Sequence, residues 1–315
     1  MSDVAHPVPE AEASPDVQVR REPRRSRRLA QLHIGVLYSR VRVEEKWIFA
    51  AMDRLGLRYD RLDDRRVYFD LQHPEPWLQY DVVLERSLSY TSGLYALRIL
   101  NGWGIPTVNT AAVAELCGDK WATSAALAQA GVPQPRATLA LSVESALEAM
   151  EGLGYPLVLK PVVGSWGRLL AKINDRDAAE AVLEHKATLG SYQHSIFYIQ
   201  EFIHKPGRDI RAFVIGDRVV TAIYRKSDHW NTNTARGAAG ELCPVTPQLE
   251  ALCLQAADAV GSGLLAIDLV EDPARGLLVN EINHTMEFHT TQPISGIDLG
   301  QLIAEYVVSV ARRKR

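Results

Sequence analysis

The pattern of apolar residues changes along the chain, and this change limits the folds that the chain can form. Between His33 and Asn109, short apolar runs such as HIGVLYS and YDVVLERS alternate with helical patterns. Beyond Gly131, the apolar runs follow one another in pairs, as in RDIRAFVIGDRVVTAIYR and in GLLAIDLVED with GLLVNEINH. Alternation of strand and helix is typical of a parallel α/β sheet, whereas paired runs are typical of antiparallel hairpins. We therefore predict an N-terminal parallel α/β domain followed by an α+β body with antiparallel sheets.

The chain is expected to divide into four segments. They are an Arg-rich tail (1–30), an N-terminal α/β domain (31–115), a central subdomain with a glycine loop (116–195) and a C-terminal subdomain (196–315). The tail ends in RREPRRSRR and has no hydrophobic periodicity, so we expect a disordered, solvated extension. The alternative is a nucleic-acid-binding arm, while the acidic residues of the tail argue against an organellar transit peptide.

Composition excludes several classes of protein. The formal net charge of -3 gives no global attraction for nucleic acid or for a membrane surface. No stretch approaches the roughly 18 apolar residues of a membrane span. The three cysteines have neither CxxC spacing nor a histidine at metal-ligand distance, so no zinc site or disulfide framework is predicted. We expect a cytoplasmic protein with no membrane partner.

The segment DLVEDPARGLLVNEIN, Asp268 to Asn283, predicts a hairpin that turns near Pro273 to Gly276. Such a hairpin places Asp268 opposite Glu281, and Asn283 shares the face of Glu281 because side chains alternate along a strand. Three oxygen donors above a rigid sheet would suit one or two magnesium ions that carry phosphate. The alternative is that these residues are solvated polar positions on an amphipathic hairpin.

Lys160 ends the apolar run PLVLK and precedes the loop GSWGR, Gly164 to Arg168. Glycines let the backbone approach a phosphate closely, and a lysine supplies a point charge to the same oxygens. The loop is not a P-loop, because the GxxxxGK pattern is absent. Trp166 is either a packing residue or a shield that keeps water from the site.

Several other residues are candidates by their placement inside or beside apolar strands. Lys120, Arg211, Arg225 and Arg236 lie on separate predicted elements, and each is otherwise an ordinary surface charge. Asp209 and Arg211 share a strand face at i and i+2, so one could hold a ribose hydroxyl while the other faces phosphate. The run FYIQEFI has the composition of an adenine-binding segment and equally that of a core strand.

Taken in order, a series of motifs resembles the nucleotide site of the ATP-grasp superfamily, RimK-like branch. The motifs are CGDKWATS, LKPVVGSWGRLLAK, YIQEFIHKPGRDIR, HWNTNTARG and VNEINHTMEF. The similarity extends from Leu32 to Val310 and is greatest with LysX-type ligases, which attach α-aminoadipate to the acidic carrier protein LysW in lysine biosynthesis. It implies an ATP-grasp fold with an N-terminal pre-ATP-grasp domain, and a homo-oligomer that uses ATP and Mg²⁺. Arg168 replaces a residue that is uncharged in many RimK-like ligases, which favours the LysX group.

The resemblance also implies a role for each motif residue. The ATP phosphates would contact Lys120, Lys160 and the loop formed by Gly164, Ser165, Trp166, Gly167 and Arg168. Adenine would lie beside Gln200, Glu201, Phe202 and Ile203, and ribose near Asp209. Magnesium would bind Asp268, Glu281 and Asn283. The transferring phosphate or substrate carboxylates would meet Arg211, Arg225 and Arg236, and the acceptor would meet Asn231, Asn233 and Thr234.

The implied reaction activates the γ-carboxylate of the carrier's C-terminal glutamate as an acyl phosphate, which the α-amino group of α-aminoadipate attacks. Two rival functions stay open: glutamate as the acceptor, on the carrier or on another protein, and a non-catalytic binding protein with a degenerate nucleotide fold. Retention of Asp268, Glu281 and Asn283 together argues against the second. The general base is not identified, with His229, His284 and Glu287 as candidates.

Overall fold

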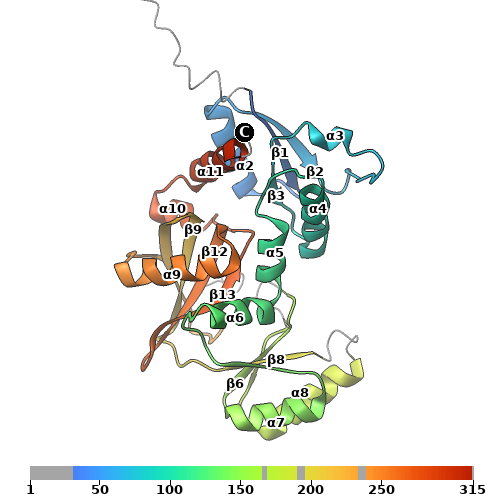
Figure 1. Ribbon diagram of the computed structural model, residues 1–315. Coiled ribbons are helices and arrows are strands. Elements are labelled where there is room, and N and C mark those ends of the chain that lie inside the picture. The colour runs from blue at the N-terminus through green and yellow to red at the C-terminus, as the bar shows by residue number, and fades with distance from the viewer. Residues whose placement is uncertain (1–30, 165–168, 190–195, 233–238, 314–315) are drawn as a thin grey trace, which may run out of the picture.

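The computed structural model describes residues 31–164, 169–189, 196–232 and 239–313. Its first unit is a parallel sheet in the order β2-β1-β3-β4, which confirms the predicted N-terminal α/β domain. The strands are β1 (His33–Tyr38), β2 (Arg58–Asp63), β3 (Val82–Arg86) and β4 (Thr107–Val108), and the helices are α2 (Val43–Arg54), α3 (Glu75–Leu78) and α4 (Tyr90–Gly102). The carboxyl ends of β1 and β3 open toward the rest of the molecule, where loops of the body approach them (Figure 1).

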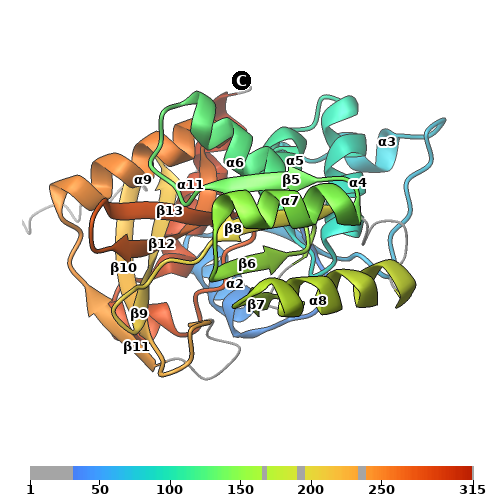
Figure 2. The ribbon, with the colours of Figure 1, turned by 90° about the horizontal axis from the view of Figure 1, so that it is seen from below.

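The second unit is an antiparallel sheet in the order β5-β8-β6-β7. Its elements are β5 (Ala137–Ala140), α7 (Val143–Leu153), β6 (Leu157–Lys160), β7 (Ala171–Ile173), α8 (Arg176–Leu189) and β8 (Phe197–Glu201). The two helices cover the side of the sheet that faces away from the other units (Figures 1 and 2). Since β8 pairs with β5 and β6, the predicted division after residue 195 cuts through this sheet.

The third unit is built on a five-stranded antiparallel sheet in the order β11-β10-β9-β12-β13. Its strands are β9 (Arg208–Gly216), β10 (Arg218–Lys226), β11 (Ala239–Cys243), β12 (Gly263–Asp272) and β13 (Gly276–Asn283). The remaining helices are α5 (Ala111–Gly118), α6 (Lys120–Gln129), α9 (Pro247–Val260), α10 (Thr291–Ser295) and α11 (Leu299–Arg313). The predicted antiparallel pairing of this part of the chain is therefore confirmed.

The two faces of the five-stranded sheet differ because side chains alternate along each strand. Val214 of β9 points to a core that includes α9. On the opposite face, Phe213 and Ile215 join a core shared with the N-terminal domain. Farther back along β9, the same face carries Asp209 and Arg211. One face of this sheet thus changes from apolar to charged, and the charged half forms the floor of the candidate site.

Helix α11 packs mainly on the N-terminal domain and also contacts β9 of the third unit. Leu299, Ile303 and Val307 are fully buried in the core that also holds β1, α2 and β3. Figure 1 shows α11 lying beside α2. The predicted C-terminal segment therefore belongs in part to the N-terminal core. No helix in the described ranges combines the length and the apolar character needed to cross a membrane.

Candidate active site

The charged half of the sheet is an ion-pair network that runs across three neighbouring strands. Arg225 of β10 donates two hydrogen bonds to Asp209 of β9, at 2.7 and 2.8 Å. Arg211 of β9 donates two bonds of 2.7 Å to the carboxylate of Asp268 on β12. The second guanidinium nitrogen of Arg225 also lies 3.2 Å from Asp268. Acids and arginines therefore alternate, and Arg225 joins the two pairs.

The charges of this network stabilise one another although most of them are buried. Burial alone would raise the pKa of Asp268, but Arg211 and Arg225 outweigh burial and hold this pKa below its usual range. Burial likewise disfavours the charged guanidinium of Arg225, yet Asp268 and Asp209 raise its pKa above the ordinary value. Asp268 therefore carries a negative charge at neutral pH, and both of its oxygens are engaged by arginine.

The predicted hairpin of β12 and β13 is confirmed, with Asp268 directly opposite Glu281. A β-bulge lies beside this pair, because Leu269 is opposite Val279 and Asn280 has no partner of its own. A bulge re-aims the side chains next to it. Asn280 and Glu281, although consecutive, consequently line the same cavity.

Two lysines from different units reach the hairpin. Lys160, the last residue of β6, is 7% exposed and donates a 3.1 Å hydrogen bond to Asn280 Oδ1. Lys120 begins α6, whose N-terminus is capped by Asp119. Its ammonium donates to the carbonyl oxygen of Gly164 at 2.7 Å and lies 3.8 Å from Glu281. Burial lowers the pKa of Lys160 to about 8, against the opposing effect of Glu281.

The oxygen donors near the hairpin suit a magnesium ion. Asp268 and Glu281 supply carboxylates, and Asn283 at the end of β13 supplies an amide oxygen. Carboxylate, amide oxygen and phosphate oxygen are the ligands that Mg²⁺ prefers. Within the described residues, no group of three or more His, Cys, Asp or Glu side chains is arranged to hold a metal. The carboxylates of Asp268 and Glu281 and the amide of Asn283 fit a cation whose other ligands are phosphate oxygens, and Arg211 would have to release an oxygen of Asp268 to admit it.

Most of the predicted site residues that the structure describes line one cavity between the second and third units, here called cavity A. These residues are Lys120, Lys160, Gly164, Gln200, Glu201, Phe202, Ile203, Asp209, Arg225, Asn231, Asp268 and Glu281. Gln200 and Glu201 end β8, and Glu201 accepts the backbone N–H of Arg136 at 2.6 Å and lies 2.7 Å from Arg275. The structure thus brings together motifs that are far apart in the sequence.

Cavity A also contains residues that sequence reasoning missed. Lys205 lies 3.6 Å from Asp209 and donates a 2.6 Å hydrogen bond to the Thr232 hydroxyl, which in turn donates to Asp209. Burial lowers the pKa of Lys205. Its position inside the YIQEFIHKPGRDIR motif was the available signal. Asn280 was not predicted, because a bulge cannot be read from the alternation of one strand.

A second cavity, cavity B, lies between the N-terminal domain and the third unit and measures about 390 Å³. The predicted residues Gly164, Arg211, Asp268, Glu281 and Asn283 line it, together with residues that the sequence did not indicate: Arg42, Glu85, Ser87, Leu88, Ser89 and Tyr90. Gly164, Asp268 and Glu281 line both cavities. The two cavities therefore meet at two of the three predicted metal ligands, Asp268 and Glu281.

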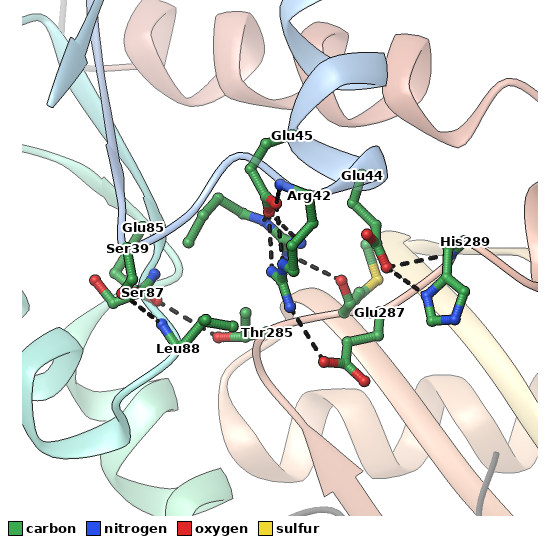
Figure 3. Close-up of polar contacts among 12 residues, drawn as sticks. Ser39, Arg42, Glu44, Glu45, Glu85, Ser87, Leu88, Thr285, Glu287 and His289 are labelled. Atoms are coloured by element: carbon green, nitrogen blue, oxygen red, sulfur yellow. Dashed lines mark hydrogen bonds and ion pairs between the residues drawn. The ribbon is translucent and has the colours of Figure 1, made fainter. Parts of the chain in front are cut away.

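Arg42 and Arg86 of the N-terminal domain connect the edge of cavity B to the segment after β13. Figure 3 shows Arg42 beside Glu45 and Glu287. Arg42 donates hydrogen bonds of 2.9 to 3.0 Å to the fully buried Glu45 and one of 3.1 Å to Glu287. Arg86 donates to Glu45 and to the carbonyl oxygen of Met286. The arrangement holds the N-terminal domain against the loop that carries Glu287.

The three candidate general bases lie in different surroundings. Burial lowers the pKa of His284 to about 4, so this histidine is neutral at pH 7. His229 accepts the backbone N–H of Asn231 at 3.0 Å and does not line either cavity. Glu287 lines cavity B and is paired with Arg42. The predicted residues Ser165, Trp166, Gly167, Arg168, Asn233, Thr234 and Arg236 lie outside the described residues.

Comparisons with known proteins agree with this geometry. Residues 34–116 match the LysX preATP-grasp domain family, and residues 117–307 match the RimK-like ATP-grasp domain family. The chain is 34% identical over 278 residues to the α-aminoadipate–LysW ligase LysX of Sulfurisphaera tokodaii, covering 87% of this chain and 96% of that protein. It is 32% identical over 282 residues to the glutamate–LysW ligase ArgX of Sulfolobus acidocaldarius, covering 88% and 98%.

Solved structures show the same architecture. The RimK-domain ATP-grasp protein of Sphaerobacter thermophilus superposes with a TM-score of 0.75 at 25% identity, covering 88% of this chain and 99% of that one. The fold, the order of the motifs and the family matches all lead to one conclusion. The chain belongs to the RimK-like ATP-grasp family of ATP-dependent ligases.

Proposed function

We propose that this ligase joins the α-amino group of α-aminoadipate to the γ-carboxyl group of the C-terminal glutamate of the carrier protein LysW. The observation that supports it most is the meeting of cavities A and B at Gly164, Asp268 and Glu281. A nucleotide in cavity A would present its terminal phosphate at this wall, and a carboxylate entering from cavity B would meet it there. The relative named LysX supplies the identity of the substrates.

The reaction has two steps. An oxygen of the carrier carboxylate attacks the γ-phosphorus of ATP, ADP leaves, and an acyl phosphate forms. The amine then attacks the acyl carbon, phosphate leaves with the bonding electrons, and the amine proton is released to solvent or to a base. Lys120 and Lys160 would neutralise phosphate charge, and Arg211 and Arg225 would stabilise the charge that moves between phosphate and carboxylate. A divalent ion held by Asp268, Glu281 and Asn283 would neutralise the phosphate oxygens further.

A mixing assay tests this proposal. The full chain is incubated with ATP, magnesium, the carrier and α-aminoadipate, and the mass of the carrier is measured. The carrier is expected to gain one aminoadipate residue while ADP appears in equal amount. Formation of ADP without a change of carrier mass, or no reaction at all, would contradict the proposal.

Glutamate is the second candidate acceptor, because the chain is nearly as similar to ArgX as to LysX. The two acceptors differ by one methylene group, and a hydrophobic pocket discriminates such a difference by about 1–3 kcal/mol. The same assay with the two amino acids in competition therefore decides between them. A larger kcat/KM for glutamate would replace the substrate proposed above and would leave the chemistry unchanged.

A further inference from the structure

Four acids line cavity B, and three of them have a cationic partner among the described residues. Asp268 is bonded to Arg211 at 2.7 Å, Glu287 to Arg42 at 3.1 Å, and Glu281 lies 3.8 Å from Lys120. The fourth is Glu85, which has no lysine, arginine or histidine nitrogen within 4.0 Å in the described part of the chain. Its neighbour in sequence, Arg86, is turned to Glu45 instead.

The surroundings of Glu85 hold its carboxyl group in place without neutralising it. Glu85 is the next-to-last residue of β3 and is 5% exposed. It accepts the backbone N–H of Ser87, and the Thr285 hydroxyl lies 3.5 Å from its other oxygen (Figure 3). On its remaining side is Gly93 of α4, where a β-carbon would stand 2.8 Å from Glu85 Oε1. The glycine leaves room for this carboxyl group at the wall of the cavity.

A buried carboxylate without a cation is costly, so it either takes up a proton or awaits a positively charged ligand. Burial raises the pKa of Glu85 above its usual range, although the Ser87 N–H and Arg86 oppose this effect. An apolar side chain in this position would avoid the cost. The position of Glu85 at the wall of a cavity, rather than inside a packed core, indicates that its partner comes from outside.

We propose that Glu85 binds the protonated amino group of the acceptor amino acid in cavity B. This inference rests on the proposed function, which requires an amine to reach the acyl phosphate. Cavity B extends from Glu85 on β3 to Asp268 and Glu281, the wall that it shares with cavity A. An amine that enters at Glu85 is thereby held in the cavity where the acyl group forms. Glu85 acts as a positioning residue for the nucleophile.

Hydroxylamine separates the two halves of the reaction, because it is a small nucleophile that is neutral at pH 7 and needs no ammonium site. The Glu85→Gln variant is assayed with ATP, magnesium and carrier, and with either hydroxylamine or the preferred one of the two amino acids. Hydroxamate formation is expected to stay within about 2-fold of wild type. The KM for the amino acid is expected to rise by about 10- to 100-fold, the usual effect of losing a hydrogen bond between charged groups.

Two further variants control the experiment. Glu115→Gln removes an exposed carboxylate that is paired with Arg98 and lines neither cavity. Its KM for the amino acid is expected to change by less than about 3-fold. Glu85→Asp keeps the charge on a shorter side chain and is expected to restore part of the affinity. It also tests the inference if the glutamine variant does not fold.

The possible outcomes distinguish the inference from the proposed function. An unchanged KM for the amino acid in Glu85→Gln overturns the inference alone. Equal loss of hydroxamate and amide formation in Glu85→Gln assigns Glu85 a structural role and also overturns it. Absence of hydroxamate in the wild-type enzyme overturns the proposed function and the inference with it.

Discussion

Among the described residues, cavities A and B each contain one buried lysine or carboxyl side chain that has no partner of opposite charge. In cavity A it is Lys160, which has no carboxylate oxygen within 4.0 Å in the described part of the chain, and in cavity B it is Glu85. Burial lowers the pKa of Lys160 to about 8 and raises that of Glu85. The charged groups of the ion-pair network are instead paired with groups of opposite charge, as Asp268 is with Arg211 and Arg225. Charges that are paired within the protein stabilise the fold, whereas buried charges without a partner are expected to bind a ligand. Lys160 is expected to bind an anion, and Glu85 a cation.

The largest effect is expected from Lys160→Met. Loss of this charge from the proposed phosphate site should lower kcat/KM for ATP by about 100- to 1,000-fold. The same variant should be more stable at pH 7, by about 1–3 kcal/mol of unfolding free energy, because a buried ammonium group is removed. Steady-state kinetics and urea unfolding measure the two effects. Lys226→Met, at an exposed lysine paired with Glu241, is the control and should alter neither. A destabilised Lys160→Met variant would show that the lysine serves the fold after all.

The stability gained by Lys160→Met should depend on pH. Below about pH 8 the lysine is protonated in the folded and in the unfolded state, so the cost of its burial is fully present. Between about pH 8 and the ordinary pKa of 10.5, the unfolded state binds more protons than the folded state, and the stability of the wild type rises relative to that of the variant. The difference in unfolding free energy between the two proteins should therefore shrink over this range. A constant difference would contradict a lowered pKa for Lys160.

Substitution of an acid that is paired with arginine should lower the unfolding free energy, in contrast to substitution of Lys160. Asp268→Asn removes the carboxylate that pairs with the partly buried Arg211 and with the buried Arg225. We expect the unfolding free energy to fall by about 3 kcal/mol and ligase activity to be lost. Urea unfolding measures the first effect and ADP release the second. Glu271→Gln breaks a more exposed pair with Arg208 in the same sheet and should cost less than about 1 kcal/mol. Equal costs for the two variants would remove the distinction between buried and exposed pairs.

The smallest effect is expected from Gly93→Ala. The added β-carbon would stand 2.8 Å from Glu85 Oε1 and should displace the carboxyl group by a few tenths of an ångström. We expect the KM for the amino acid to rise by about 3- to 10-fold, with the KM for ATP unchanged. Gly102→Ala in the same helix is a matched control, because its β-carbon would meet no atom within 4 Å. If both substitutions have the same effect on the KM for the amino acid, the change follows from the helix and not from Glu85.

Sequence reasoning predicted elements well where apolar periodicity is strong. It placed Asp268 opposite Glu281 and gave both antiparallel sheets their main strands. It missed β2, whose sequence RYDRLD is polar because the strand forms an exposed edge of the sheet. It also missed α11, although Leu299, Ile303 and Val307 follow one another at helical spacing. A charged edge strand gives little periodic signal, whereas α11 could have been found.

The candidate site was predicted where residues stand in motifs and missed where the fold alone brings them together. Lys120, Lys160 and Asp268 are far apart in the sequence, and the resemblance placed them in one site. Glu85 and Arg42 belong to no such motif, and they reach cavity B only because β3 and the N-terminus of α2 end at its edge. Contacts between domains cannot be derived from the periodicity of either domain. For this reason the lining of cavity A was predicted more completely than that of cavity B.

The position of α11 has a consequence for biosynthesis. Leu299 and Ile303 complete the core around β1 and α2, yet they are translated after the whole ATP-grasp body. The N-terminal sheet is therefore synthesised well before the helix that covers part of its apolar face, whereas domains in general fold as units in the order of their synthesis. We expect this first domain to depend on chaperones until α11 emerges, and to mature last although it is made first.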